Sequence, residues 1–79
     1  MKIKVKYFAA MREAIGTSEE IIDCEFSTPS DLFTFLKEKY RFKLDESNIK
    51  VAINDEYAEF TRQLSERDTV VFIPPVAGG

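Results

Sequence analysis

The residues with the clearest chemical potential lie at the carboxyl end of the chain. The sequence closes with Gly78 and Gly79. The carboxyl group of Gly79 has no side chain beside it, so it could enter a tunnel too narrow for any other residue. An α-carboxyl group has a pKa of about 3.5 and is ionised at neutral pH. It could therefore act as a nucleophile towards the α-phosphate of ATP.

A terminal diglycine alone is also typical of a frayed end without chemistry. Here, however, it follows an apolar stretch, residues 69–73, and two prolines that cannot continue a strand ladder. Prolines favour the extended polyproline conformation, and six extended residues reach roughly 20 Å at about 3.3 Å each. We therefore predict a body, residues 1–73, and an extended tail, residues 74–79. The residues that would carry Gly79 into a partner are Pro74, Pro75, Val76, Ala77 and Gly78.

The rest of the chain is poorly equipped for catalysis. It contains no histidine, so it lacks the usual general base and the commonest metal ligand. Its one cysteine, Cys24, shares strand parity with Ile22 and Phe26, which predicts a core position rather than a reactive thiol. We therefore expect no metal site, and a protein that is not catalytic alone.

Composition excludes several classes of partner. Seventy-nine residues are enough for one small domain. The net charge of −3 argues against a nucleic-acid binder, which needs a basic surface. No apolar run approaches the roughly 20 residues that span a bilayer, and the first residues do not resemble a signal segment. We therefore expect a cytoplasmic protein without nucleic-acid or membrane partners.

Hydrophobic periodicity predicts the elements that hold the tail. The expected elements are strands over residues 2–8, 19–26, 49–53, 57–60 and 69–73, a short helix over 9–15, and a main helix from Pro29 to about Arg41. Asn54 and Asp55 predict a hairpin turn. We assign Val70 and Phe72 to the core, and expect Phe8 and Ile73 to form an exposed apolar patch for a partner.

This order of elements predicts an α+β fold. The first and last strands both look central, so we expect them to lie side by side and parallel in a mixed sheet packed on one main helix. That arrangement is the ubiquitin-like β-grasp. A ferredoxin-like sandwich is the alternative, but it needs two long helices, and residues 9–15 are too few for one of them.

Two stretches resemble the small subunit of molybdopterin synthase, a ubiquitin-like sulfur carrier. Residues 7–16 are similar to that family's Phe-Ala…Arg-Glu…Gly pattern after the first strand, and residues 72–79 are similar to its closing Phe-Pro-Pro-Val-x-Gly-Gly. Ile73 stands where many members have an aromatic residue, which could alter one partner contact.

The resemblance implies a complete reaction cycle. A ubiquitin-activating-type adenylyltransferase would use ATP to adenylate Gly79, and a persulfide sulfur donor would convert it to a thiocarboxylate. The synthase large subunit would then take the tail and pass the sulfur to a cyclic pyranopterin precursor, building the molybdopterin dithiolene. Two small and two large subunits would form a heterotetramer, with no cofactor bound permanently to this chain. Three alternatives stay open: a ubiquitin-like protein modifier, a thiamine-type sulfur carrier, and a plain interaction domain.

Overall fold

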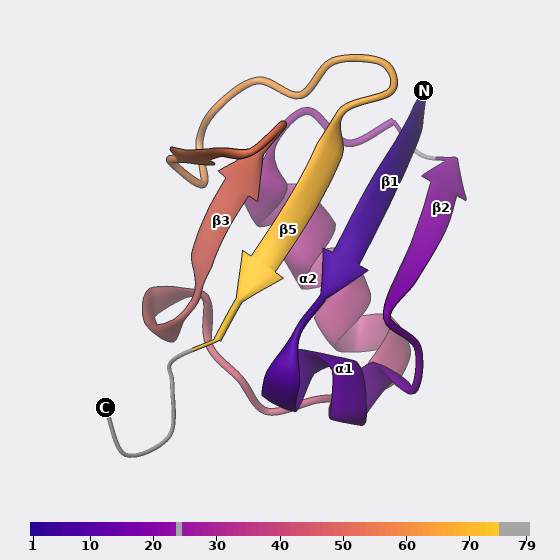
Figure 1. Ribbon diagram of the computed structural model, residues 1–79, viewed down its shortest axis with the longest axis vertical. Coiled ribbons are helices and arrows are strands. Elements are labelled where there is room, and N and C mark those ends of the chain that lie inside the picture. Colours follow the sequence, from indigo (N-terminus) through magenta and orange to yellow (C-terminus); the bar gives the residue numbers. More distant parts are fainter. Residues whose placement is uncertain (24, 75–79) are drawn as a thin grey trace.

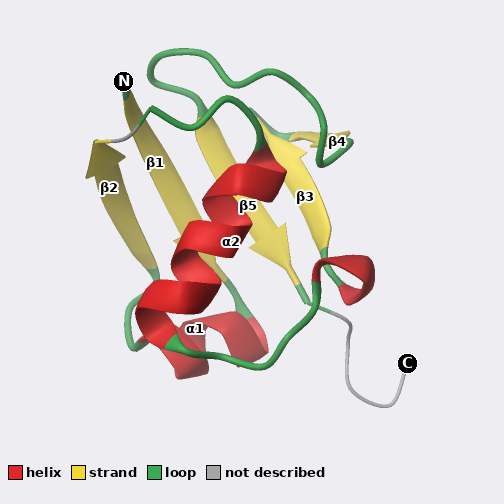
Figure 2. Cartoon of the chain, turned by 180° about the vertical axis from the view of Figure 1, so that it is seen from behind, coloured by secondary structure: helices red, strands yellow, loops and turns green. Residues whose placement is uncertain are grey.

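The computed structural model describes residues 1–23 and 25–74, in which one sheet carries a long helix on one face (Figure 1, Figure 2). In chain order the elements are β1 (Lys2–Tyr7), α1 (Ala9–Ile15), β2 (Glu19–Asp23), α2 (Pro29–Tyr40), the 3₁₀ turn η1 (Glu46–Asn48), β3 (Lys50–Ile53), β4 (Glu56–Ala58) and β5 (Thr69–Ile73). The strand order is β2-β1-β5-β3-β4. β1 and β5 pair in parallel at the centre, and the other pairs are antiparallel. The predicted β-grasp is confirmed.

The main helix begins and ends as its sequence predicts. Thr28 is extended, and its Oγ1 accepts a hydrogen bond from the Asp31 amide at 3.3 Å, which satisfies one free donor of the first turn. Pro29 occupies the first helical position, where no amide donor is needed. Arg41 closes the helix in the left-handed conformation, with its amide donating to the Lys37 carbonyl. The helix thus ends one residue before the predicted limit.

The core lies between α2 and the sheet and is centred on Phe33. This ring lies 5.4 Å from Phe42, 6.0 Å from Phe60 and 5.4 Å from Phe72, in edge-on arrangements that aromatic pairs prefer. Leu36, one turn further along α2, is fully buried. The predicted core assignment of Val70 and Phe72 is confirmed, since both have no exposed surface.

Four strands are shorter than predicted: β1 ends at Tyr7 rather than Phe8, β3 begins at Lys50 rather than Ile49, and β2 and β4 differ more. β2 ends at Asp23 rather than Phe26, because Asp23 pairs with Lys2 and β1 offers no further strand residue beyond that point. Phe26 still reaches the core by packing on Phe35, with ring centroids 5.1 Å apart. β4 ends at Ala58 rather than Phe60. The chain leaves the sheet there, and the Phe60 carbonyl accepts from the Ser30 amide at 3.1 Å.

One face of the sheet carries no helix, and we call it the open face; Figure 1 looks onto it and Figure 2 shows α2 on the other side. Side chains alternate between the two faces along each strand. The register therefore assigns to the open face Lys2, Lys4, Lys6, Glu19, Ile21, Asp23, Lys50, Ala52, Tyr57, Thr69, Val71 and Ile73.

A partly buried carboxylate joins the helix to the inner face of the sheet. Glu20 lies opposite Val5, on the parity that faces the core. Its Oε2 accepts hydrogen bonds from the Tyr7 hydroxyl at 2.6 Å and from the Tyr40 hydroxyl at 2.8 Å. Tyr7 belongs to β1 and Tyr40 to the last turn of α2, so one carboxylate links three elements. Burial, reinforced by the bond to Glu20, raises the pKa of Tyr7 well above its usual value of 10.

This contact predicts a loss of stability in alkali. Because the pKa of Tyr7 is higher in the folded state than in the unfolded state, its contribution is complete below about pH 10 and declines as the pH rises further. We expect the denaturant midpoint of the wild type to fall more steeply above pH 10 than that of Tyr7→Phe. At neutral pH the variant should be less stable by about 1–2 kcal/mol, the cost of one lost charge-assisted hydrogen bond.

Tyr57→Phe is the matched control, because it also removes one phenol but from a side chain that is 76 % exposed. It should keep the alkaline slope of the wild type. Identical pH profiles for Tyr7→Phe and the wild type would contradict the proposed role of the hydroxyl.

Candidate functional site

The candidate site lies at the edge of the sheet where β1 and β5 end. Because these strands are parallel, with Tyr7 beside Phe72, their carboxyl ends meet at the same edge. The next residue of each strand is Phe8 or Ile73, the two residues predicted as a partner-binding patch. The structure therefore brings these two positions together at the base of the tail. The same edge lies at the bottom of Figure 1, beside α1.

Phe8 lies directly before α1 and is exposed, whereas Met11, within α1, anchors the helix in the core. Phe8 keeps an extended backbone at the start of α1, and its carbonyl accepts from the Met11 amide at 3.0 Å. Met11 is fully buried, whereas 48 % of Phe8 remains exposed. Gly16 then closes α1 at a φ of 92°, a left-handed conformation that a side chain would strain.

Ile73 is half-buried at the end of β5, opposite Lys50 of β3, and the next residue, Pro74, is buried. Pro74 is the first residue of the predicted tail and the last that the structure describes. The roles predicted for Pro75, Val76, Ala77, Gly78 and Gly79, and the core position predicted for Cys24, lie outside the described residues.

Tyr57 adds an exposed aromatic ring to the open face, and no binding role was predicted for it from the sequence. It lies opposite Ala52, whose other neighbour is Val71 of β5. The signal for this placement was present in the sequence. Asn54 and Asp55 both have positive φ, as in the two-residue hairpin turn that their types favour. That turn fixes Tyr57 opposite Ala52, hence on the face of Val71.

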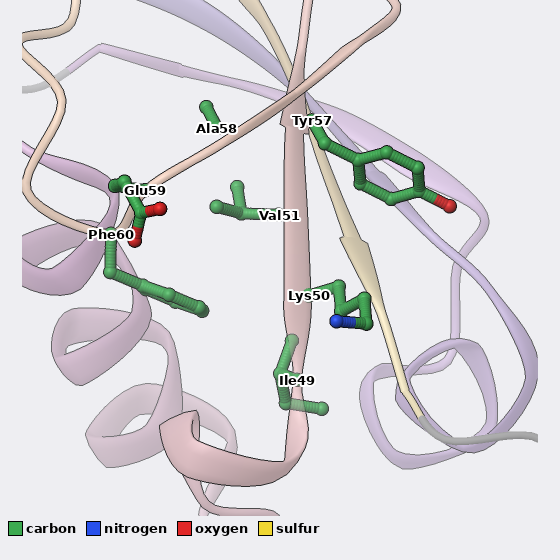
Figure 3. Close-up of a pocket in the computed structure, with 7 residues that line it drawn as sticks. All are labelled: Ile49, Lys50, Val51, Tyr57, Ala58, Glu59 and Phe60. Carbon is green, nitrogen blue, oxygen red and sulfur yellow. The ribbon is translucent and has the colours of Figure 1, made fainter.

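A groove opens beside this surface, where β4 ends after three residues (Figure 3). Its volume is about 620 Å³, and its lining residues are Ile49, Lys50, Val51, Tyr57, Ala58, Glu59 and Phe60. In Figure 3 the side chains of Lys50 and Tyr57 lie on one side of β3, and that of Phe60 lies on the other. The groove therefore runs around the edge of the sheet rather than into the core.

Residues 1–23 and 25–74 contain no cluster of histidine, cysteine or acidic side chains that could hold a metal ion. Among the helices in the same residues, none is long and apolar enough to cross a bilayer. The side chains around the tail base are apolar or cationic, with Lys6 beside Val71 and Lys50 beside Ile73. Such a surface can dock a protein and present a chain terminus.

Known proteins match this chain over nearly its whole length. A match to the ThiS family covers residues 5–79. The chain belongs to the ThiS family. Among curated relatives, the molybdopterin synthase sulfur carrier subunit of Mycobacterium tuberculosis is 35 % identical, covering 100 % of this chain and 99 % of the relative. The subunit of the same name from Escherichia coli is 31 % identical, covering 98 % and 99 %.

Solved structures of similar proteins share the fold. The small archaeal modifier protein 1 of Methanosarcina acetivorans is 30 % identical, with a TM-score of 0.76, covering 99 % of this chain and 96 % of the other. Subunit 1 of the molybdopterin-converting factor of Helicobacter pylori was solved as a complex with subunit 2. The matching chain is 25 % identical, with a TM-score of 0.70 and complete coverage of both chains.

The assignment of adjacent residues to opposite faces of the sheet can be tested at Phe72 and Ile73. Ile73 is half-buried on the open face and Phe72 is fully buried against Phe33. Ile73→Lys should lower the free energy of unfolding by only about 1 kcal/mol, within the range of single surface changes. Phe72→Lys puts an unpaired charge in the core and should prevent cooperative folding. Thermal unfolding followed by circular dichroism checks both, and a reversed ranking would show that the parity is wrong.

Proposed function

We propose that this chain is the sulfur-carrier subunit of a molybdopterin synthase, with Gly79 as the sulfur acceptor. The observation that carries the proposal is that the central strand β5 leads directly into Pro-Pro-Val-Ala-Gly-Gly, at the edge of the sheet where Phe8 is exposed and Ile73 half-buried. Relatives named as molybdopterin synthase sulfur carriers match the chain from end to end, which supports the same role.

The chemistry resides in the terminal carboxylate. One oxygen of Gly79 attacks the α-phosphate of ATP, forming an acyl-adenylate and releasing pyrophosphate. A persulfide sulfur then displaces AMP, and after reduction of the sulfur–sulfur bond by the donor system the terminus is a thiocarboxylate. The thiocarboxylate gives its sulfur to a cyclic pyranopterin precursor, and water restores the carboxylate. Each step needs a base or a cationic group. In this proposal these groups belong to the partners, which fits the absence of histidine from the chain.

Three partners follow from this cycle. A ubiquitin-activating-type adenylyltransferase supplies the ATP site, and a persulfide donor supplies sulfur. A large subunit receives the charged tail, as the complex of subunits 1 and 2 from Helicobacter pylori supports for a relative of this chain. In the assembly two carriers and two large subunits form a heterotetramer, with residues 75–78 threaded into the large subunit.

The apolar patch should contribute to that assembly. Ile73→Lys removes apolar contact area and adds a charge that must be desolvated on binding. We expect it to weaken binding to the large subunit by about 10-fold or more, measured by calorimetry, with the fold retained. Lys50→Ile is a useful converse, because it enlarges the patch beside Ile73 and should not weaken binding. Wild-type affinity in Ile73→Lys would exclude this patch from the interface.

A second candidate function is protein modification. The small archaeal modifier protein 1 of Methanosarcina acetivorans, at 30 % identity, is nearly as similar as the carrier relatives. A modifier would share adenylation but would join Gly79 to a lysine amine through an isopeptide bond. Higher-mass conjugates of this chain on cellular proteins would support that function, whereas a thiocarboxylate that accumulates without conjugates would support the carrier.

The position of the terminal carboxylate is the direct test of the carrier mechanism. Adding one residue after Gly79, or deleting Gly79, moves the carboxylate by about 3.5 Å, and a misplacement of 1 Å can cost about 100-fold in rate. Both variants should fold normally but lose sulfur loading. Gly78→Val keeps the length, adds a branched side chain, and should lose loading severely.

The measurement is intact mass after incubation with ATP, adenylyltransferase and sulfur donor, where loading replaces one oxygen by sulfur. Lys37→Gln, on α2 and with an unchanged terminus, serves as the control for the chemistry. Normal loading of the Gly79 deletion would falsify the mechanism.

A further inference from the structure

The end of the open face away from the tail carries a cluster of cationic side chains, which we call the far corner: Lys2, Lys4 and Arg67. They surround Ile21, which is 67 % exposed, and line a groove of about 400 Å³ with Thr69. β1 and β5 both begin here, so the far corner lies at the edge opposite Phe8 and Ile73.

The open face has the opposite charge to the molecule. Its strands contribute four lysines and two carboxylates, although the whole chain has 11 cationic and 14 acidic residues and a net charge of −3. The remaining residues therefore include seven cationic and twelve acidic ones. Arg67 borders the open face and adds to its positive charge. A negatively charged protein thus presents one positive face.

Backbone contacts hold the far corner in place. Arg67 has a φ of 67°, a left-handed conformation that costs a residue with a side chain about 1 kcal/mol or more. Its amide donates to the Lys2 carbonyl at 2.8 Å, and the Lys4 amide donates to the Asp68 carbonyl at 3.0 Å. The Asp68 side chain is buried and accepts from the Ser65 amide at 2.8 Å. These bonds fix Arg67 beside the two lysines.

The carboxylates near the far corner leave its charge available. Glu19 lies 3.5 Å from Lys4, and both side chains are about half exposed, so this pair is weak and exchangeable. Asp23 lies 3.4 Å from the terminal amine, and Glu66 accepts from the Lys2 backbone amide rather than from its side chain. Among the described residues, no carboxylate lies within 4 Å of the charged groups of Lys2 or Arg67.

We propose that the far corner docks a carboxylate-rich surface, with an apolar side chain for Ile21, on the subunit that receives the tail. The inference rests on the proposed function. The cationic face attracts an anionic partner surface, although the molecule as a whole is acidic. This charge complementarity indicates a partner surface that is rich in carboxylates. The far corner and the base of the tail lie on one continuous surface, and the partner is therefore the subunit that receives the tail. The residues that connect them along the open face are Lys4, Thr69, Lys6, Val71 and Ile73. The far corner steers the carrier, and the apolar patch then closes on the partner.

The test compares two triple variants that change the net charge equally. The first, Lys2→Gln with Lys4→Gln and Arg67→Gln, neutralises the far corner. The second, Lys37→Gln with Lys39→Gln and Lys43→Gln, neutralises two lysines of α2, which lies behind the sheet, and one lysine that follows α2 in the chain. Stopped-flow association with the large subunit is measured in low salt and again at about 1 M, where the Debye length is only about 3 Å. We expect the far-corner variant to associate about 10-fold more slowly in low salt and at the wild-type rate in high salt. The α2 variant should stay within about 2-fold throughout.

Equal slowing of both variants would show that only net charge matters and would overturn the proposal, as would unchanged rates in both. Anionic vesicles or a short DNA duplex that bind the wild type through the far corner, without an effect on the large subunit, would assign the surface to another partner class. Sulfur loading of Gly79 is measured in parallel at saturating adenylyltransferase. Its loss in the wild type would count against the proposed function, whereas normal loading with unchanged association rates would count only against the far corner.

Discussion

The parallel pairing of β1 with β5 is the constraint on which the rest of the structure depends. It joins strands from the two ends of the chain, so the segment between them must cross one face of the sheet, and α2 does so. Closing such a long loop costs entropy that grows only slowly with its length. Burial of Phe72 and Val70 against α2 offsets that cost. Because parallel strands end at one edge, the same pairing also sets Phe8 beside the base of the tail.

The two faces of the sheet have different roles: the inner face forms the core, and the open face is the proposed binding surface. The inner face holds the aromatic cluster around Phe33 and one carboxylate, Glu20, whose hydrogen bonds to Tyr7 and Tyr40 attach the end of the helix. This carboxylate is partly buried, and both hydroxyls satisfy its hydrogen-bonding capacity. The open face contributes little to the core, since Ala52 is the one open-face strand residue among the described residues that is buried. Near the tail it combines the apolar Phe8 and Ile73 with Lys6 and Lys50, and at the opposite edge it carries Lys2, Lys4 and Arg67.

The sequence predicted features that depend on local pattern and missed those that depend on pairing. Alternation located β1, because a half-buried strand imposes that period directly, and a continuous apolar run located β5. The inward positions of Val70 and Phe72 were assigned from strand parity and are correct. Strand ends were wrong at Phe26 and Phe60. β2 stops where its partner β1 runs out, whereas β4 leaves the sheet although β3 continues to Lys50, and the Phe60 carbonyl bonds to Ser30 instead. Glu20 shares the parity of Ile22 and could have been flagged as a charge on a core-facing position. Its acceptor role depended on Tyr40, which only the packing of α2 brings within reach.

Because Pro74 is buried against the domain, the surface that a partner contacts must lie close to the carboxyl group that reacts. Five residues follow Pro74, and even fully extended they span no more than about 17 Å. A partner that reaches the Gly79 carboxylate must therefore approach the edge of the sheet where Phe8 and Ile73 lie. Contacts at that edge persist through the reaction and cannot by themselves favour the transition state over the bound substrate. Their contribution is to fix the terminus relative to the partner's catalytic groups, which converts a bimolecular encounter into a positioned one. A domain without histidine can in this way take part in acyl and sulfur transfer while supplying only a carboxylate and a rigid surface.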